Sequence, residues 1–193
     1  MTNYKKLSFQ ALFILAISIS ILSCTNNKPE DSKDVAEQTN DAKFDRESNE
    51  KDAEFLVDAA EISMEEINLG KLAQTKDVMN RVKELGKMME QDHTKTLASL
   101  TQLAQNKVVT LPASQTDDAI AAYEKLNKKT GNDFGKAYSD MMVEGHKDAI
   151  ALFEKASTDC TDNDIRNWAL EALPGLRRHL ESAMISQKES NKM

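Results

Sequence analysis

Between residues 53 and 187, apolar side chains recur at the three- and four-residue spacing of amphipathic helices, without strand-like alternation. Alanine, leucine, methionine, lysine and glutamate dominate this segment, and all of them are compatible with helix. The pattern predicts four long helices and a short one between the second and the third: residues 53–73, 76–105, 116–127, 132–157 and 162–187. We therefore expect one all-α domain with one core.

The predicted connections indicate how these helices are joined. Two tight hairpins are linked by a long connection that contains the short helix, which is typical of a ferritin-like four-helix bundle. Thr161 to Asp164 supply a capping-box-like start for the last long helix. Pro174 lies inside that helix and removes one backbone donor, which predicts a kink. Residues 188–193 are expected to form a disordered tail.

The segment before the bundle has a different pattern. Residues 24–52 are polar and charged with only scattered apolar positions, so they cannot bury enough surface to fold. We expect a flexible tether with a reach of roughly 30 Å.

The first 23 residues read as an export signal. Lys5 and Lys6 precede an apolar run that is too short for a transmembrane helix, and Ser23 and Cys24 follow it. The letters ILSC resemble a bacterial lipobox, which implies cleavage before Cys24 and lipidation of that cysteine. The alternatives are a retained anchor helix and an ordinary signal with a chance cysteine. The lipobox resemblance places the protein in the cell envelope, anchored to the outer membrane on its periplasmic face or at the cell surface.

Cysteine usage and charge narrow the possible partners. The chain has two cysteines; once Cys24 is lipidated, Cys160 has no intramolecular partner, and we interpret it as an incidental thiol in a polar loop. The net charge of −7 argues against nucleic acid, whose binding depends on neutralising phosphates. The predicted partner is the membrane, through the lipid anchor, and the sequence leaves any protein partner open.

Polar side chains fall on the predicted inner faces of all four long helices. Glu66 lies near the middle of the first apolar stripe, and Asp92 and His93 lie on the two shoulders of the second. His146 and His179 lie on shoulders of the third and fourth stripes, so three helices each carry one of the three histidines.

Imidazole and carboxylate groups suit zinc, iron and copper, so these five residues are candidate metal or ligand-binding residues. Glu90 and His93 also spell the Glu-x-x-His pair of di-iron bundles. That pair does not recur before His146 or His179, and Glu90 points away from the stripe, so a di-iron carboxylate site is not favoured. The alternative is that the histidines close the core through hydrogen bonds across helices.

Axial position gives a second test of a shared site. With a turn near Thr75, Glu66 and His93 would differ in height by roughly 13 Å and could not share one ion. His146 and His179 would differ by only about 7 Å, so contact through one ion or water stays possible.

The helical region resembles a bacterial family named domain of unknown function 4142 over residues 53–186. The resemblance rests on four stretches: AEFLVDAAEISMEEINLGKLA, VKELGKMMEQDHTKTLASLTQLA, FGKAYSDMMVEGHKDAIALFEKA and ALPGLRRHL. Asp92 and His93 fit an acid–histidine block of that family, whereas His146 follows a glycine in place of the aspartate. The resemblance implies a ferritin-like bundle of the bacterial envelope and no particular activity.

No nucleophile elbow, phosphate-binding loop, Cys-x-x-Cys pair or dinucleotide turn occurs in the sequence. We therefore assign no catalytic residue and expect a protein that is not an enzyme. Two hypotheses remain. The first is an envelope lipoprotein whose bundle is a binding, structural or stress-related module. The second is a metal-binding or metal-dependent protein that uses the inner-face histidines and carboxylates.

Overall fold

The computed structural model describes residues 29–44, 46–76 and 78–192, and this part of the chain is helical without any strand. Cys24 and the predicted signal lie outside the described residues. These residues form six helices: α1 (Ser32–Asp41), α2 (Glu47–Thr75), α3 (Asn80–Lys107), α4 (Asp117–Asn127), α5 (Gly131–Asp159) and α6 (Asn163–Ser190). The prediction of an all-α helical bundle is confirmed.

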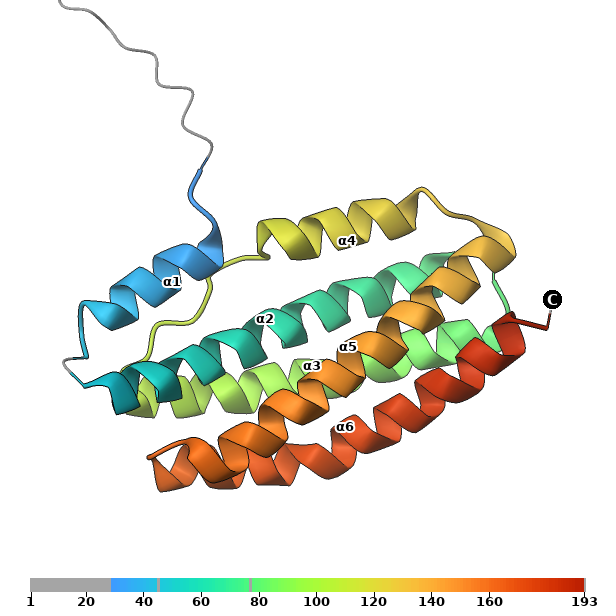
Figure 1. The fold of residues 1–193 in the computed structure, drawn as a ribbon. Helices are drawn as coiled ribbons and strands as arrows, with labels where there is room; N and C mark the ends of the chain where they lie inside the picture. Colours follow the sequence, from blue (N-terminus) through green and yellow to red (C-terminus); the bar gives the residue numbers. More distant parts are fainter. Residues whose placement is uncertain (1–28, 45, 77, 193) are drawn as a thin grey trace, which may run out of the picture.

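The four long helices form the bundle, with α2 beside α3 and α5 beside α6 (Figure 1). Helix α4 lies in the long connection between the two hairpins and packs on α2 and α5 (Figure 1). The predicted connectivity is therefore correct. Helix α6 stays a single helix through Pro174 and continues to Ser190, whose side chain is buried against α5 near Gly135. The predicted disordered tail thus begins too early.

Part of the predicted tether is folded against the bundle. Helix α1 packs on α2, where the Lys33 ammonium group donates to Asp58 at 2.6 Å and to Glu61 at 2.8 Å. Asn40 is buried and exchanges two hydrogen bonds with the backbone of Thr110. The tether prediction was wrong here because specific polar contacts compensate for the low apolar content of the segment.

Two glycines bring α2 and α3 close together and fix the level of one helix against the other. A Cβ atom added at Gly70 would lie 2.5 Å from the carbonyl oxygen of Gly86, and one added at Gly86 would lie 2.7 Å from the carbonyl oxygen of Gly70. The centre of this hairpin is therefore near residue 78. Because α3 begins only at Asn80, the turn predicted near Thr75 is misplaced. His93 then lies level with residue 63, so the separation predicted between Glu66 and His93 is wrong.

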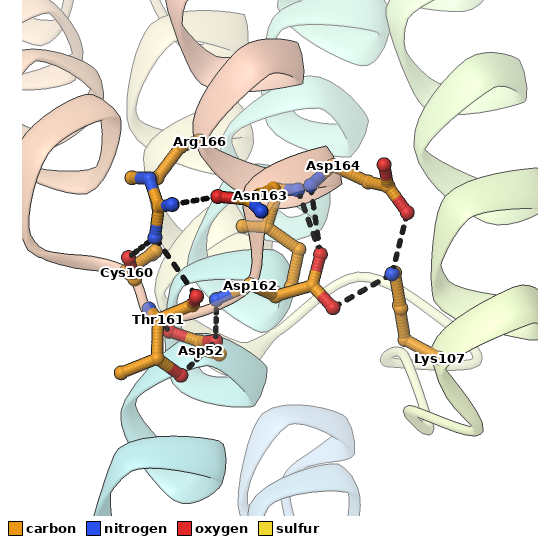
Figure 2. Close-up of polar contacts among 9 residues, drawn as sticks. Asp52, Lys107, Cys160, Thr161, Asp162, Asn163, Asp164 and Arg166 are labelled. Atoms are coloured by element: carbon orange, nitrogen blue, oxygen red, sulfur yellow. Dashed lines mark hydrogen bonds and ion pairs between the residues drawn. The ribbon is translucent and has the colours of Figure 1, made fainter.

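The buried Asp52 joins the start of α2 to the loop between α5 and α6 (Figure 2). Its carboxylate accepts hydrogen bonds from the backbone and hydroxyl of Thr161 and from the backbone of Asp162, each at 2.8 Å. Asp162 in turn caps α6, as the sequence predicts, and pairs with Lys107 at 2.6 Å. Cys160 is buried beside this network, and burial and the nearby Asp52 carboxylate raise the pKa of its thiol to about 12.

The Asp52 contacts generate the first prediction. Asp52→Ala should lower the free energy of unfolding by about 3 kcal/mol, because it leaves backbone donors of the loop without their charged acceptor. Urea denaturation followed by circular dichroism measures the loss. Glu47→Ala is the control: it removes an exposed ion pair with Lys51, which contributes little to stability, so its effect should be small beside that of Asp52→Ala. Equal losses in the two variants would show that Asp52 does not stabilise the loop.

Candidate metal centre

The apolar core is divided into two clusters, and a polar layer lies between them. One cluster includes Phe55, Leu100, Phe153 and Leu176, and the other includes Leu69, Met89, Phe134 and Ala183. Between them in sequence, each long helix contributes one buried titratable side chain: Glu66 from α2, His93 from α3, His146 from α5 and His179 from α6. The predicted single core is therefore interrupted by these four side chains.

The three histidines meet in the centre of the bundle, which answers the question that the sequence left open. The ring of His93 is 5.7 Å from that of His146 and 5.3 Å from that of His179, centroid to centroid. The rings of His146 and His179 are also 5.3 Å apart. One ring nitrogen from each residue can be chosen so that all three lie within 4.8 Å of one another. The cluster is thus compact enough for three nitrogens to approach one ion.

The hydrogen bond of His146 determines which of its nitrogens is free. Its Nδ1 lies 2.9 Å from the carbonyl oxygen of Met142, one turn earlier on α5. A carbonyl only accepts, so Nδ1 carries the proton and Nε2 keeps its lone pair. That Nε2 is buried without a hydrogen-bond partner among the described residues. Burial, and then the neighbouring His179, lower the pKa of His146 to about 4, so the ring is neutral at pH 7.

In His179 the hydrogen-bonded nitrogen is Nε2 and not Nδ1, and its partner is Asp92. Nε2 of His179 lies 3.1 Å from the Asp92 carboxylate, to which Arg178 and Lys95 also donate. Partial burial opposes ionisation of Asp92, but these three hydrogen bonds prevail and lower its pKa to about 2. The carboxylate therefore accepts the Nε2 proton. Burial lowers the pKa of His179 despite Asp92, and its Nδ1 is left buried without a partner among the described residues.

His93 contributes the third nitrogen. Both of its ring nitrogens are buried, and neither has a partner in the part of the chain that the structure describes. Burial, followed by the proximity of His179 and His146, lowers its pKa to about 3. A neutral imidazole has one lone pair. Three uncharged rings thus present three lone pairs within one compact cluster.

The candidate carboxylates lie outside this cluster. Glu66 is level with it, but its Oε1 is 3.6 Å from Nδ1 of His146, the nitrogen that faces Met142. Burial, and then Glu65, raise the pKa of Glu66 to about 8, so it is protonated at pH 7 and does not form an ion pair with His146. Glu90 accepts a hydrogen bond from Gln74 at 2.7 Å and takes no part in the cluster.

Three contacts of this centre were not anticipated from the sequence. Lys95 lies three residues after Asp92, and Arg178 directly precedes His179. The spacing of these charged residues could therefore have indicated both contacts. The third contact is with the Met142 carbonyl, a backbone group that every residue has, so the residue type at this position does not predict it.

A cavity of about 240 Å³ between α3 and α6 reaches the cluster, and His93 and His179 are part of its wall. Ile62, Phe153 and Leu176 form apolar parts of the wall, and its polar or charged side chains include Asp92, Lys95, Thr96, Glu171 and Arg178. The cluster is therefore buried but not sealed from outside on the side of His93 and His179.

Fold and site together define a helical-bundle protein with a buried three-histidine cluster. The chain belongs to the family described as Domain of unknown function (DUF4142), whose model matches residues 36–185. No curated protein and no solved structure matches the chain. The likeness to ferritins therefore stays a prediction.

The unpartnered nitrogens of His93 generate the second prediction. His93→Leu should raise the unfolding free energy of metal-free protein by about 1 kcal/mol at pH 7, because an apolar side chain replaces buried polar atoms without protein partners. The gain should grow by about 2 kcal/mol at pH 5. The folded-state pKa of about 3 lies below the unfolded value near 6.5, so protons bind the unfolded chain and the wild type loses stability as pH falls.

Urea denaturation of both proteins in the presence of a chelator, at pH 7 and pH 5, provides the measurement. Comparing the two proteins cancels the opposing effect of Glu66, whose raised pKa makes the fold less stable as pH rises from about 4.5 to 8. A variant that is less stable than the wild type at both pH values would contradict the prediction.

Proposed function

We propose that this protein is a lipid-anchored envelope protein whose bundle binds one transition-metal ion between His93, His146 and His179. The observation that carries the proposal is that three imidazole rings meet in the bundle, and each has a buried nitrogen without a protein partner among the described residues. Buried polar atoms are normally satisfied, so three exceptions in one cluster favour a ligand that accepts lone pairs. The alternative of histidines that merely close the core is less well supported, since only His146 and His179 make hydrogen bonds.

The chemistry of the ligands selects the class of ion. Imidazole suits zinc, copper, iron and nickel, whereas calcium and magnesium prefer oxygen ligands, which the cluster does not offer. Divalent copper stands highest in the affinity order for such sites. Because burial lowers the pKa of all three rings, protons do not compete with the metal at pH 7.

The groups around the histidines support this proposal. In metal-bound histidines the N–H of the second ring nitrogen usually donates a hydrogen bond to a carboxylate or a backbone carbonyl. This bond fixes the orientation of the ring and raises the basicity of the nitrogen that binds the metal. His179 has Asp92 in that position, and His146 has the Met142 carbonyl with Glu66 beside it. The proposal assigns a binding role and no reaction.

Metal binding provides the third prediction. After removal of metal with a chelator, the purified protein should bind one Zn²⁺ or Cu²⁺ per chain, measured by isothermal titration calorimetry and elemental analysis. His93→Leu should abolish stoichiometric binding, because it removes one of three ligands. Asp92→Asn should weaken binding by roughly 10- to 100-fold, because His179 loses its charged partner.

Glu90→Gln is the matched control for this experiment. Glu90 lies on the same helix three residues before His93 but outside the cluster, so its substitution should leave affinity and stoichiometry unchanged. A wild type that binds no metal, or a His93→Leu variant that keeps one ion per chain, would refute the proposed site.

Membrane attachment through Cys24 is the second part of the proposal, and it rests on the lipobox-like ILSC sequence. Within the described residues, no helix has the length and apolar character needed to cross a membrane.

The fourth prediction tests this anchor. Cys24→Ser should lose incorporation of a labelled fatty acid and shift from the membrane fraction to the soluble or unprocessed fraction. Cys160→Ser is the control, because it removes the chain's other cysteine and should leave labelling intact. Normal labelling of Cys24→Ser would exclude lipidation at this residue.

A further inference from the structure

Among the described residues, the proposed metal centre has three protein ligands. The protonated carboxyl group of Glu66 and the carboxylate of Asp92 lie beside the outer nitrogens of His146 and His179, and the compact ligand set within the described residues consists of histidines alone. Structural zinc sites are closed by four protein ligands, whereas sites with three leave a position for water or another ligand. An ion bound here would therefore keep an exchangeable position.

The 240 Å³ cavity between α3 and α6 provides access to that position, because His93 and His179 are part of its wall. It is smaller than the range of about 300–1,000 Å³ that is typical for drug-sized ligands, so it suits a small molecule. Its wall includes the apolar side chains of Ile62, Phe153 and Leu176 beside the polar or acidic side chains of Ser63, Asp92, Thr96 and Glu171.

Charge determines the kind of molecule. Three neutral imidazoles leave both charges of a divalent ion uncompensated, which favours an anion at the open position. The nearest carboxylate, Asp92, already accepts hydrogen bonds from Lys95, Arg178 and His179. Phosphate carries more negative charge than a single carboxylate, and Asp92 and Glu171 lie in the same wall. A single carboxylate needs only the metal.

We propose that the metal-loaded bundle binds a small carboxylate with a short aliphatic chain, whose carboxylate occupies the open metal position and whose chain lies in the cavity between α3 and α6. This inference rests on the proposed metal site. The apolar side chains of the wall contact the aliphatic chain, and Lys95 and Arg178 offset the charges of Asp92 and Glu171 in the same wall.

Cobalt substitution offers a direct test, because the visible spectrum of Co²⁺ reports its ligands. The full-length protein loaded with one Co²⁺ is titrated with azide, acetate, butyrate and inorganic phosphate. We expect spectral changes with azide and with both carboxylates. Butyrate should bind roughly tenfold or more tightly than acetate, because each additional buried CH₂ group gains about fourfold in affinity.

Gly175 allows the cavity to be filled without disturbing the histidines. It lies in the cavity wall on α6, and a Cβ atom added there meets no atom within 4 Å. Gly175→Leu should weaken butyrate binding at least tenfold while Co²⁺ still binds at one ion per chain. Gly175→Ala is the matched control, because it makes the same change in helix propensity without filling the cavity and should bind butyrate like the wild type.

The outcomes separate the two proposals. Failure of the wild type to bind Co²⁺ would overturn the metal site and this inference with it. Stoichiometric Co²⁺ whose spectrum does not respond to any anion would overturn the open position alone. Tighter binding of phosphate than of butyrate, or equal butyrate affinity in Gly175→Leu and the wild type, would overturn the proposed carboxylate and its location.

Discussion

Burial of uncharged titratable groups in the middle of the bundle is the constraint on which the rest of this structure depends. Glu66 is held in its acid form and the three histidines in their neutral forms, because they are buried between two apolar clusters. A charged form of any of them would be costly in this setting. The same neutrality that makes the layer compatible with a packed core leaves its nitrogen lone pairs available. The stability of the bundle and its proposed chemistry are thus set by one feature.

Bringing four side chains from four helices to one level requires precise helix positions, and contacts far from the layer supply them. The close approach of Gly70 and Gly86 sets α2 against α3. At the other end of α2, Asp52 holds the loop between α5 and α6. The hydrogen bond between Ser139 and Ser186 joins α5 to α6 in the interior. These polar and backbone contacts are directional, whereas apolar packing alone tolerates sliding.

The sequence predicted the features that depend on periodicity within one helix. It missed those that depend on the position of one helix against another along the bundle axis. Five of the six helices, their connectivity and the inward direction of the histidines follow from apolar spacing. Helix α1 was missed because Lys33 and Asn40 dock by hydrogen bonds, which leave no apolar pattern. The relation between Glu66 and His93 was misjudged because the start of α3 at Asn80 lengthens the turn by a few residues. The pattern of a single helix does not predict whether the histidines lie close enough to share one ion, since this depends on the alignment of separate helices.

The docking of α1 also changes how the helical bundle would be held at a membrane. If Cys24 carries the acyl chains as proposed, only residues 25–31 separate the bilayer from folded structure, because α1 begins at Ser32. Seven residues span at most about 25 Å, whereas the 28 residues of a fully flexible tether could extend to nearly 100 Å. The bundle would then stay close to the lipid surface with little freedom to tumble. Molecules would reach it from the layer of solvent next to the headgroups, and its encounters would be limited to that layer.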